Sequence, residues 1–251
     1  KRVGRSFSWV VQQPPFMQAK KIKDLSLIID SITVDERIIK PCRIFCIGKN
    51  YVEHIRELGD FDSTPQSKNE KQPVVFMKPT TSIVSLEESI HVPSHGDILH
   101  HEVEVVVLLN GGGRNILVDD SFSYIDGVTL GLDLTLRDVQ IGLKKKGHPW
   151  ELSKSFDQSS PLGTMRSYDG SFDLFNISFA CFVNEEKRQE GNTKDMLFSI
   201  PKIISYLSTV WKLVAGDLIY TGTPSGIGAI KSQDKIVLNS PILGRFEWDV
   251  F

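Results

Sequence analysis

Short apolar runs, rich in β-branched residues, recur along the chain and are separated by clusters of Gly, Pro, Asn and Asp. Runs of this length between turn residues are typical of β-strands. They lie at 43–47, 74–77, 102–109, 127–134, 176–183, 218–221 and 235–238. Apolar residues recur three and four apart, as in helices, chiefly at 51–58, 136–145 and 200–211. We therefore expect a β-rich α+β fold, because long helices that alternate with strands, as in a doubly wound sheet, are missing.

Length and charge narrow the classes of protein further. A chain of 251 residues with 40% hydrophobic content can bury a core within one domain. Its formal net charge of -2 argues against a general nucleic-acid binder, because phosphate recognition draws on an excess of Lys and Arg. No apolar stretch approaches the roughly 20 residues that span a bilayer. The sequence thus predicts no nucleic-acid partner and no transmembrane segment.

Residues 1–41 differ from the rest, and we expect an N-terminal extension or arm there, followed by one main domain at 42–251. A helix-like or mixed segment is expected at 22–32. Residues 1–23 contain several Lys and Arg but no acidic residue. This bias fits the remains of an organelle-import segment, and it fits a solvated basic tail equally well. The first expectation for location is therefore the mitochondrial matrix, and the second is the cytoplasm.

The three cysteines, Cys42, Cys46 and Cys181, are odd in number and stand among apolar residues. This pattern favours reduced, buried thiols over a disulfide framework. A metal site at Cys42 and Cys46 is disfavoured, because no further Cys or His lies nearby in sequence.

Two carboxylates stand two residues apart in the apolar run at 100–109. If this run is one strand, its period of two puts Glu102 and Glu104 on the same face, which continues as Val106 and Leu108. Two neighbouring carboxylates repel each other and resist desolvation. They therefore lie either in water at a sheet edge or around a cation.

A third carboxylate, Asp133, ends the next apolar run and favours the cation. Three hard oxygen ligands without a convergent set of Cys or His predict Mg²⁺ or Mn²⁺ rather than Zn²⁺. His100 and His101 could compete as ligands, but we expect them at the strand edge or behind the carboxylates.

Six strings of the sequence carry a family resemblance: GKNY at 48–51, LHHEVE at 99–104, LDLTLRDVQ at 132–140, KKKGHPW at 144–150, KSFD at 154–157 and TGTP at 221–224. Together they resemble the fumarylacetoacetate hydrolase family, in its order and at its spacing. Within the family the likeness is to the short mitochondrial type that cleaves acylpyruvates and decarboxylates oxaloacetate, and it runs from about residue 43 to the end. Residues 1–41 have no counterpart in the short members.

The resemblance implies a mixed β-sandwich roll of the family's C-terminal domain type, and a homodimer. It implies that Glu102, Glu104 and Asp133 hold Mg²⁺ or Mn²⁺. It also implies that Lys154 faces the substrate and that His54 lies with Glu57 on a lid over the site.

The residue types fit this chemistry. His54 and Glu57 stand three apart in a short helix, so the carboxylate can orient the imidazole as a general base. The Lys154 ammonium would stabilise the enolate oxygen that forms as a carbon–carbon bond breaks. Arg137 and Gln140, one turn apart, are expected to bind or position the substrate carboxylate and a water molecule.

The loop at 221–228 reads Thr-Gly-Thr-Pro-Ser-Gly-Ile-Gly. It lacks the lysine of a phosphate-binding P-loop and is not followed by a convincing helical pattern, which argues against nucleotide binding. By resemblance it supplies Thr223 and backbone amides to the substrate. The other interpretation is a plain turn between strands.

The sequence thus predicts a divalent-metal-dependent enzyme that acts on small 2-oxo acids, by acylpyruvate hydrolysis, by oxaloacetate decarboxylation or by both. Two alternatives stay open. Relatives also act as hydratases or isomerases of unsaturated 2-oxo acids. The chain could also be an accessory structural subunit of a larger mitochondrial complex that retains the fold and the metal site, with residues 1–41 as the docking arm.

Overall fold

A six-stranded sheet, in the order β11-β8-β7-β14-β3-β4, forms the centre of the molecule in a computed structural model that describes residues 32–35, 37–59 and 72–251. The sheet is mixed, because β14 runs parallel to β3 while the other neighbours are antiparallel. Its strands are β3 (Arg43–Gly48), β4 (Val74–Lys78), β7 (Val103–Leu109), β8 (Ile125–Leu132), β11 (Arg166–Ser167) and β14 (Asp217–Tyr220).

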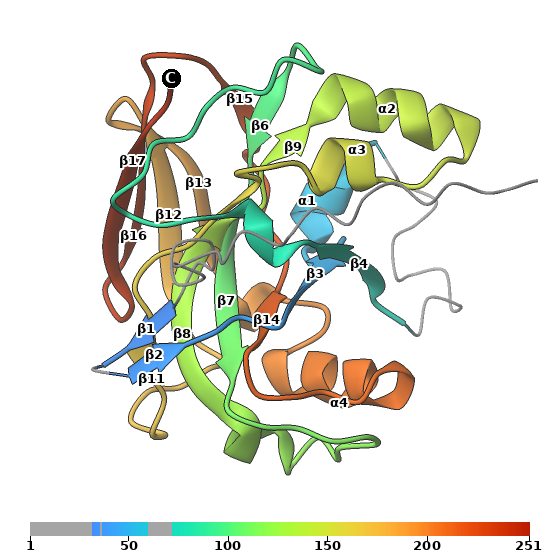
Figure 1. Ribbon diagram of the computed structural model, residues 1–251, viewed down its shortest axis with the longest axis vertical. Helices are drawn as coiled ribbons and strands as arrows, with labels where there is room; N and C mark the ends of the chain where they lie inside the picture. Colours follow the sequence, from blue (N-terminus) through green and yellow to red (C-terminus); the bar gives the residue numbers. More distant parts are fainter. Residues whose placement is uncertain (1–31, 36, 60–71) are drawn as a thin grey trace, which may run out of the picture.

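A four-stranded antiparallel sheet, β13-β12-β16-β17, lies to one side of β7 and β8 (Figure 1). Its strands are β12 (Ser178–Val183), β13 (Glu186–Asn192), β16 (Lys235–Ser240) and β17 (Gly244–Asp249). A three-stranded sheet joins β6 (Leu99–His101), β9 (Thr135–Leu136) and β15 (Gly228–Ile230). Two small pairs complete the set: β1 (Ile32–Val34) with β2 (Arg37–Ile39), and β5 (Ile83–Val84) with β10 (Ser160–Pro161).

The helices of the described residues are few and short. They are α1 (Val52–Glu57), α2 (Arg137–Lys146), α3 (Glu151–Lys154) and α4 (Ile200–Val210), with 3₁₀ turns at η3 (Thr80–Ser82), η4 (Ser121–Tyr124) and η5 (Thr193–Asp195). None of these helices is both long and apolar enough to span a membrane. Gly147 ends α2 in the left-handed conformation, the conformation that glycine adopts at a helix C-terminus without strain.

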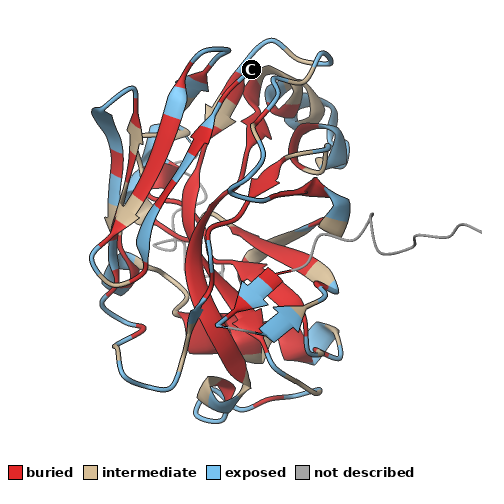
Figure 2. Ribbon diagram, turned by 60° about the vertical axis from the view of Figure 1, so that its left-hand side comes forward, coloured by how far each residue is buried: buried red, intermediate tan, exposed pale blue. Residues whose placement is uncertain are grey.

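The core occupies both faces of the six-stranded sheet. β7 and β8 are buried along their whole length, and Figure 2 shows them as red strands through the middle of the molecule. The odd-numbered residues of β7, such as Val105, join the larger cluster with residues of the four-stranded sheet and of α4. Val106 and Leu108 join a smaller cluster on the opposite face. The alternation of β7 therefore divides its side chains between two cores.

The predicted fold class is confirmed: the chain forms a strand-rich α+β roll of packed sheets with few helices. One detail was wrong. The run 100–109, expected to be one strand, divides at Glu102, because β6 pairs with β15 and β9 while β7 pairs with β8 and β14. Glu102 thus lies where the chain passes from one sheet to another.

The β1–β2 hairpin brings part of the expected N-terminal extension onto the main domain. Ile32 and Val34 are buried in the smaller cluster, and Arg37 forms a two-pronged ion pair with Asp126 of β8, with a shortest distance of 2.8 Å. Residues 1–31, which include the basic segment and most of the expected helix-like segment, lie outside the described residues. The division at residue 41 stays a prediction.

The three cysteines are free, as the sequence predicted. Cys46 and Cys181 are buried, but the expectation of burial was wrong for Cys42, which is exposed. Its backbone N–H donates to the Gly216 carbonyl at 2.8 Å.

Gly131 of β8 supplies a test of this packing. A Cβ atom there would lie 2.9 Å from Pro161, Tyr220 and Val106, in contacts too short for real Cβ atoms. We expect Gly131→Ala to lower the free energy of unfolding by about 1–3 kcal/mol in urea titrations. Gly142 of α2 is the control, because nothing lies within 4 Å of its Cβ position. Gly142→Ala should stabilise the protein by about 0.5–1 kcal/mol, and equal effects of the two substitutions would contradict the close packing.

Candidate active site

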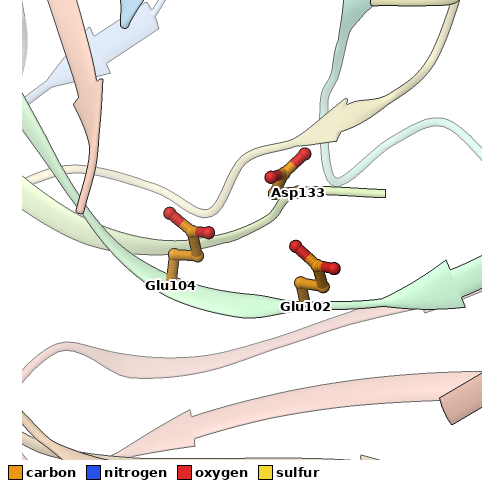
Figure 3. Close-up of side chains that lie close together, drawn as sticks. All are labelled: Glu102, Glu104 and Asp133. Atoms are coloured by element: carbon orange, nitrogen blue, oxygen red, sulfur yellow. The ribbon is translucent and has the colours of Figure 1, made fainter. Parts of the chain in front are cut away.

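Three buried carboxylates meet at one end of the β7–β8 pair. Glu102 precedes β7, Glu104 lies in it, and Asp133 follows β8 directly. The antiparallel register pairs Val103 with Leu132, and the Asp133 N–H donates to the Glu102 carbonyl at 2.9 Å. One ligand oxygen from each side chain lies within 4.8 Å of the others (Figure 3). The structure therefore brings together the three carboxylates that the sequence singled out.

Buried cations surround this cluster. The Lys154 ammonium, at the end of α3, donates to Glu102 Oε2 at 2.7 Å and to Asp133 Oδ2 at 2.6 Å. Lys78, at the end of β4, lies 2.8 Å from Asp133 Oδ1 in an ion pair. Arg137, the first residue of α2, donates to Glu102 Oε1. Each cation comes from a different element, so the local fold of α2, α3 and β4 fixes the charge of the site.

The neighbouring cations give the carboxylates different pKa values. Burial opposes ionisation of Glu102, but Lys154 and Arg137 outweigh it and hold its pKa well below the usual value. Burial, and then repulsion from Asp133, raises the pKa of Glu104 well above its usual value. The backbone N–H of Gly222, at 2.7 Å from Oε2, offsets only part of this. Among the ion pairs of the described residues, those of the cluster involve Glu102 and Asp133 and not Glu104.

The donor set fits a divalent metal ion. Asp133 Oδ1 is buried and accepts no hydrogen bond, since its contact with Lys78 is an ion pair without hydrogen-bond geometry. Hard carboxylate oxygens in one buried cluster are the ligands that Mg²⁺ and Mn²⁺ prefer. A cation beside Glu104 would also remove the repulsion that raises its pKa. Within the described residues the candidate metal group contains no Cys and no His.

The histidines next to the cluster are neutral groups. Burial lowers the pKa of His100 to about 4 and also lowers the pKa of His101. His101 is buried in β6, and its Nδ1 lies 2.8 Å from Gln189 Oε1. Both histidines therefore lie beside the carboxylates and outside the candidate metal group, as the sequence suggested.

The His54–Glu57 pair forms within α1. His54 is buried, and its Nδ1 lies 3.1 Å from Glu57 Oε2. Glu57 Oε1 also accepts the Gly226 N–H at 3.0 Å. Burial opposes ionisation of Glu57, but the hydrogen bonds from His54 and from the loop lower its pKa below the usual value. An ionised Glu57 therefore holds the Nδ1–H tautomer of His54 and leaves Nε2 as the basic nitrogen.

One small cavity joins these groups. His54, Arg137, Gln140, Lys154 and Thr223 line it together with the three carboxylates. Its volume of about 30 Å³ holds about two water molecules. Glu57 supports His54 from outside the cavity lining. All the residues that the sequence selected as candidates therefore lie in this cavity or against it.

Arg137 and Gln140 are already linked to each other in this arrangement. The Arg137 guanidinium donates to Gln140 Oε1 at 2.6 Å as well as to Glu102. The three lysines at 144–146 are exposed. The Lys144 ammonium lies 5.4 Å from the centroid of the Trp150 ring, and both residues line the cavity. Lys144 thus forms a cation–π contact with Trp150 in the lining of the cavity.

Two buried residues of the site were missed by the sequence analysis. Lys78 could have been found from the sequence, because it ends the apolar run of β4, where a charged residue is unexpected. Gln189 gives none, because the other residues around it in β13 are mostly charged and exposed. Both act through contacts between residues far apart in sequence.

Comparisons with known proteins show what the chain is similar to. Residues 43–250 match the family described as fumarylacetoacetate (FAA) hydrolase C-terminal. The mitochondrial oxaloacetate tautomerase FAHD1 of Mus musculus is 44% identical over 193 residues, which cover 77% of this chain and 84% of the relative.

Two solved structures share the fold. A fumarylpyruvate hydrolase from Pseudomonas aeruginosa, in complex with Mn²⁺ and pyruvate, superposes with a TM-score of 0.82 at 29% identity, covering 89% of this chain and 96% of the other. A 2-hydroxyhepta-2,4-diene-1,7-dioate isomerase from Mycobacterium marinum gives a TM-score of 0.70 at 27% identity, with 84% and 74% covered.

The raised pKa of Glu104 predicts a pH-dependent cost in the metal-free protein. Above the unfolded pKa of about 4.3 the folded state loses stability as pH rises, by at most about 1.4 kcal/mol per pH unit, because it holds the Glu104 proton more tightly than the unfolded chain does. Glu104→Gln keeps an acceptor for the Gly222 N–H and removes this cost. In urea titrations with chelator, the free energy of unfolding of the variant should exceed that of the wild type most at pH 8 and least near pH 5.

Glu190→Gln is the matched control, because Glu190 is exposed on β13 and forms an ion pair with the exposed Lys187. Its effect should stay within about 0.5 kcal/mol across this pH range. A Glu104→Gln difference that does not change with pH would mean that Glu104 is ionised in the folded protein at every pH tested.

Proposed function

Because the chain belongs to the fumarylacetoacetate hydrolase family, we propose that it is an enzyme that uses a divalent cation to process small 2-oxo acids, by acylpyruvate hydrolysis, by oxaloacetate decarboxylation or by both. The observation that carries the proposal is the shared cavity, in which a His–Glu pair faces three buried carboxylates and the Lys154 ammonium. Mn²⁺ and pyruvate in the Pseudomonas aeruginosa relative support both the cation and the substrate class.

The substrate is bound by the cations that surround the carboxylates. Glu102, Glu104 and Asp133 would hold Mg²⁺ or Mn²⁺, which would supply Lewis acidity toward the 2-oxo acid. Lys154 lies next to two of these ligands, so its ammonium can stabilise the negative charge on the 2-oxo oxygen as the enolate forms. Arg137 places a guanidinium at the same wall for a second carboxylate.

His54 moves the proton. In acylpyruvate hydrolysis its Nε2 takes a proton from water, which then attacks the carbonyl being cleaved. Decarboxylation of oxaloacetate needs only the stabilised enolate, and therefore depends less on His54. Tautomerisation, the activity in the name of the mouse relative, passes through the enolate of intact oxaloacetate, which the same groups can stabilise, and also needs a proton moved at carbon. One cavity can thus support all three reactions.

Isomerisation of unsaturated 2-oxo acids is the second candidate function, and the Mycobacterium marinum isomerase supports it. Hydrolysis needs an activated water molecule, which the His54–Glu57 pair can supply, whereas isomerisation needs none. The pair therefore favours hydrolysis. The accessory-subunit alternative depended on residues 1–41, and no contact of the described residues 32–35 and 37–41 favours it. Homodimer formation and a mitochondrial location also stay proposals, and the mitochondrial relative supports the second.

Turnover of oxaloacetate and acetylpyruvate by the purified protein tests the proposal. We expect turnover with Mg²⁺ or Mn²⁺, loss of it with chelator, and a fall of at least about 100-fold in Glu102→Ala, because a cation ligand and the partner of two basic side chains are removed together. Absence of turnover of either substrate by folded, metal-loaded protein, with turnover of 2-hydroxydienoates instead, would favour the isomerase function.

His54→Ala separates the two reactions. We expect it to lower kcat for acetylpyruvate hydrolysis by about 100-fold to 10,000-fold, the usual contribution of a general base, and to lower oxaloacetate decarboxylation much less. Glu57→Gln should lower hydrolysis in the same direction but less, because the amide still contacts His54. Equal loss of both activities in His54→Ala would contradict this division of roles.

A further inference from the structure

Gln189 is a buried amide in a strand that is otherwise largely exposed. Gln189 is 1% exposed, whereas its neighbours Arg188 and Glu190 in β13 are exposed to solvent. A buried side-chain amide is stable only when its donors and acceptor are satisfied. Gln189 therefore depends on the partners that it meets inside the molecule.

All the hydrogen-bonding capacity of Gln189 is used. Its Oε1 lies 3.1 Å from the Val103 N–H and 2.8 Å from His101 Nδ1. Its Nε2 donates to the Pro224 carbonyl at 2.9 Å and to Thr223 Oγ1 at 2.8 Å. The Val103 N–H can only donate and the Pro224 carbonyl can only accept, so the orientation of the amide is determined. His101 must then carry its proton on Nδ1.

These contacts join two walls of the active-site cavity. Val103 stands between Glu102 and Glu104, the two carboxylates of the β6–β7 segment. Thr223 lines the cavity from the opposite loop at 221–228. The Gln189 amide therefore sets the distance between the carboxylates and Thr223.

The contact also determines what Thr223 can do. A hydroxyl group has one proton to donate and two lone pairs. Because Thr223 Oγ1 accepts a hydrogen bond from Gln189 Nε2, the hydroxyl proton of Thr223 is left for another acceptor. An anionic carboxylate in the cavity is such an acceptor, and hydrogen bonds to charged groups are stronger than neutral ones.

We infer that Gln189 is a positioning residue, which acts through Thr223 by keeping its hydroxyl as a donor to the substrate carboxylate and by holding the 221–228 loop against the Glu102–Glu104 segment. This role rests on the proposed function, since it requires a 2-oxo acid in the cavity. Gln189 itself touches neither the substrate nor the reacting atoms.

Gln189→Glu is the most informative variant. The carboxylate keeps the shape and the acceptor contacts with Val103 and His101, but it cannot donate to Thr223 or Pro224. The Thr223 hydroxyl would then donate to residue 189 instead of to the substrate. Gln189→Met, which removes both the donor and the acceptor of the amide without adding a charge, is the second variant.

The test is binding of oxalate, a dicarboxylate that cannot react, to Mn²⁺-loaded protein by titration calorimetry. Thr223→Val should raise the Kd for oxalate about 10-fold to 100-fold, as expected for loss of a hydrogen bond to a charged group. Gln189→Glu and Gln189→Met should raise it in the same direction, while the Kd for Mn²⁺ alone changes by less than about threefold. Thr223→Ser, which retains the hydroxyl, should bind oxalate like the wild type.

The double variant Gln189→Glu with Thr223→Val separates positioning from a general structural effect. If Gln189 acts through Thr223, the double variant binds oxalate no more weakly than Thr223→Val alone, so the two losses are strongly non-additive. Losses that multiply, or oxalate binding that is unchanged in both Gln189 variants, would overturn the inference. Glu190→Gln, on the exposed face of the same strand, is the control and should match the wild type.

The same measurements distinguish this inference from the proposed function. A wild-type protein that turns over oxaloacetate and binds oxalate, beside Gln189 variants that do so equally well, overturns the role of Gln189 alone. A wild-type protein that binds Mn²⁺ but neither turns over 2-oxo acids nor binds oxalate overturns both.

Discussion

Burial of three carboxylates in one cavity is the constraint on which the site depends. Such a cluster is costly unless cations compensate it. The structure places three cationic side chains, Lys154, Lys78 and Arg137, against Glu102 and Asp133. When all are ionised, the three negative charges of the carboxylates equal in number the three positive charges of these cations. A divalent ion adds two positive charges, which a dicarboxylate such as oxaloacetate would balance.

The loop at 221–228 contacts three separate parts of the site. Its Gly222 N–H donates to Glu104, its Gly226 N–H donates to Glu57, and Thr223 accepts from Gln189. Glu57 therefore orients His54 and anchors the loop at the same time. A displacement of the loop would move the proposed general base, the candidate metal ligand Glu104 and the proposed substrate contact at Thr223 together.

Much of this arrangement could be predicted from the sequence. The β-branched runs, the alternation of Glu102 with Glu104 and the polar end of the next run at Asp133 are local patterns, and the structure has them. The break at Glu102 could not be predicted, because it depends on which strands pair with β6 and β7 and not on the residues of the segment. The place of Lys78 and Gln189 in the site could not be predicted either, because their partners lie far away in sequence.

The central claim is that Glu102, Glu104 and Asp133 form a site for a divalent cation that takes a 2-oxo acid. Titration of the purified protein with Mn²⁺, followed by the paramagnetic resonance signal of the free ion, tests it most directly. We predict one Mn²⁺ per chain, bound more tightly when oxalate is present, and loss of this binding in Asp133→Asn. Absence of stoichiometric binding by the folded wild-type protein, or undiminished binding by Asp133→Asn, would contradict it.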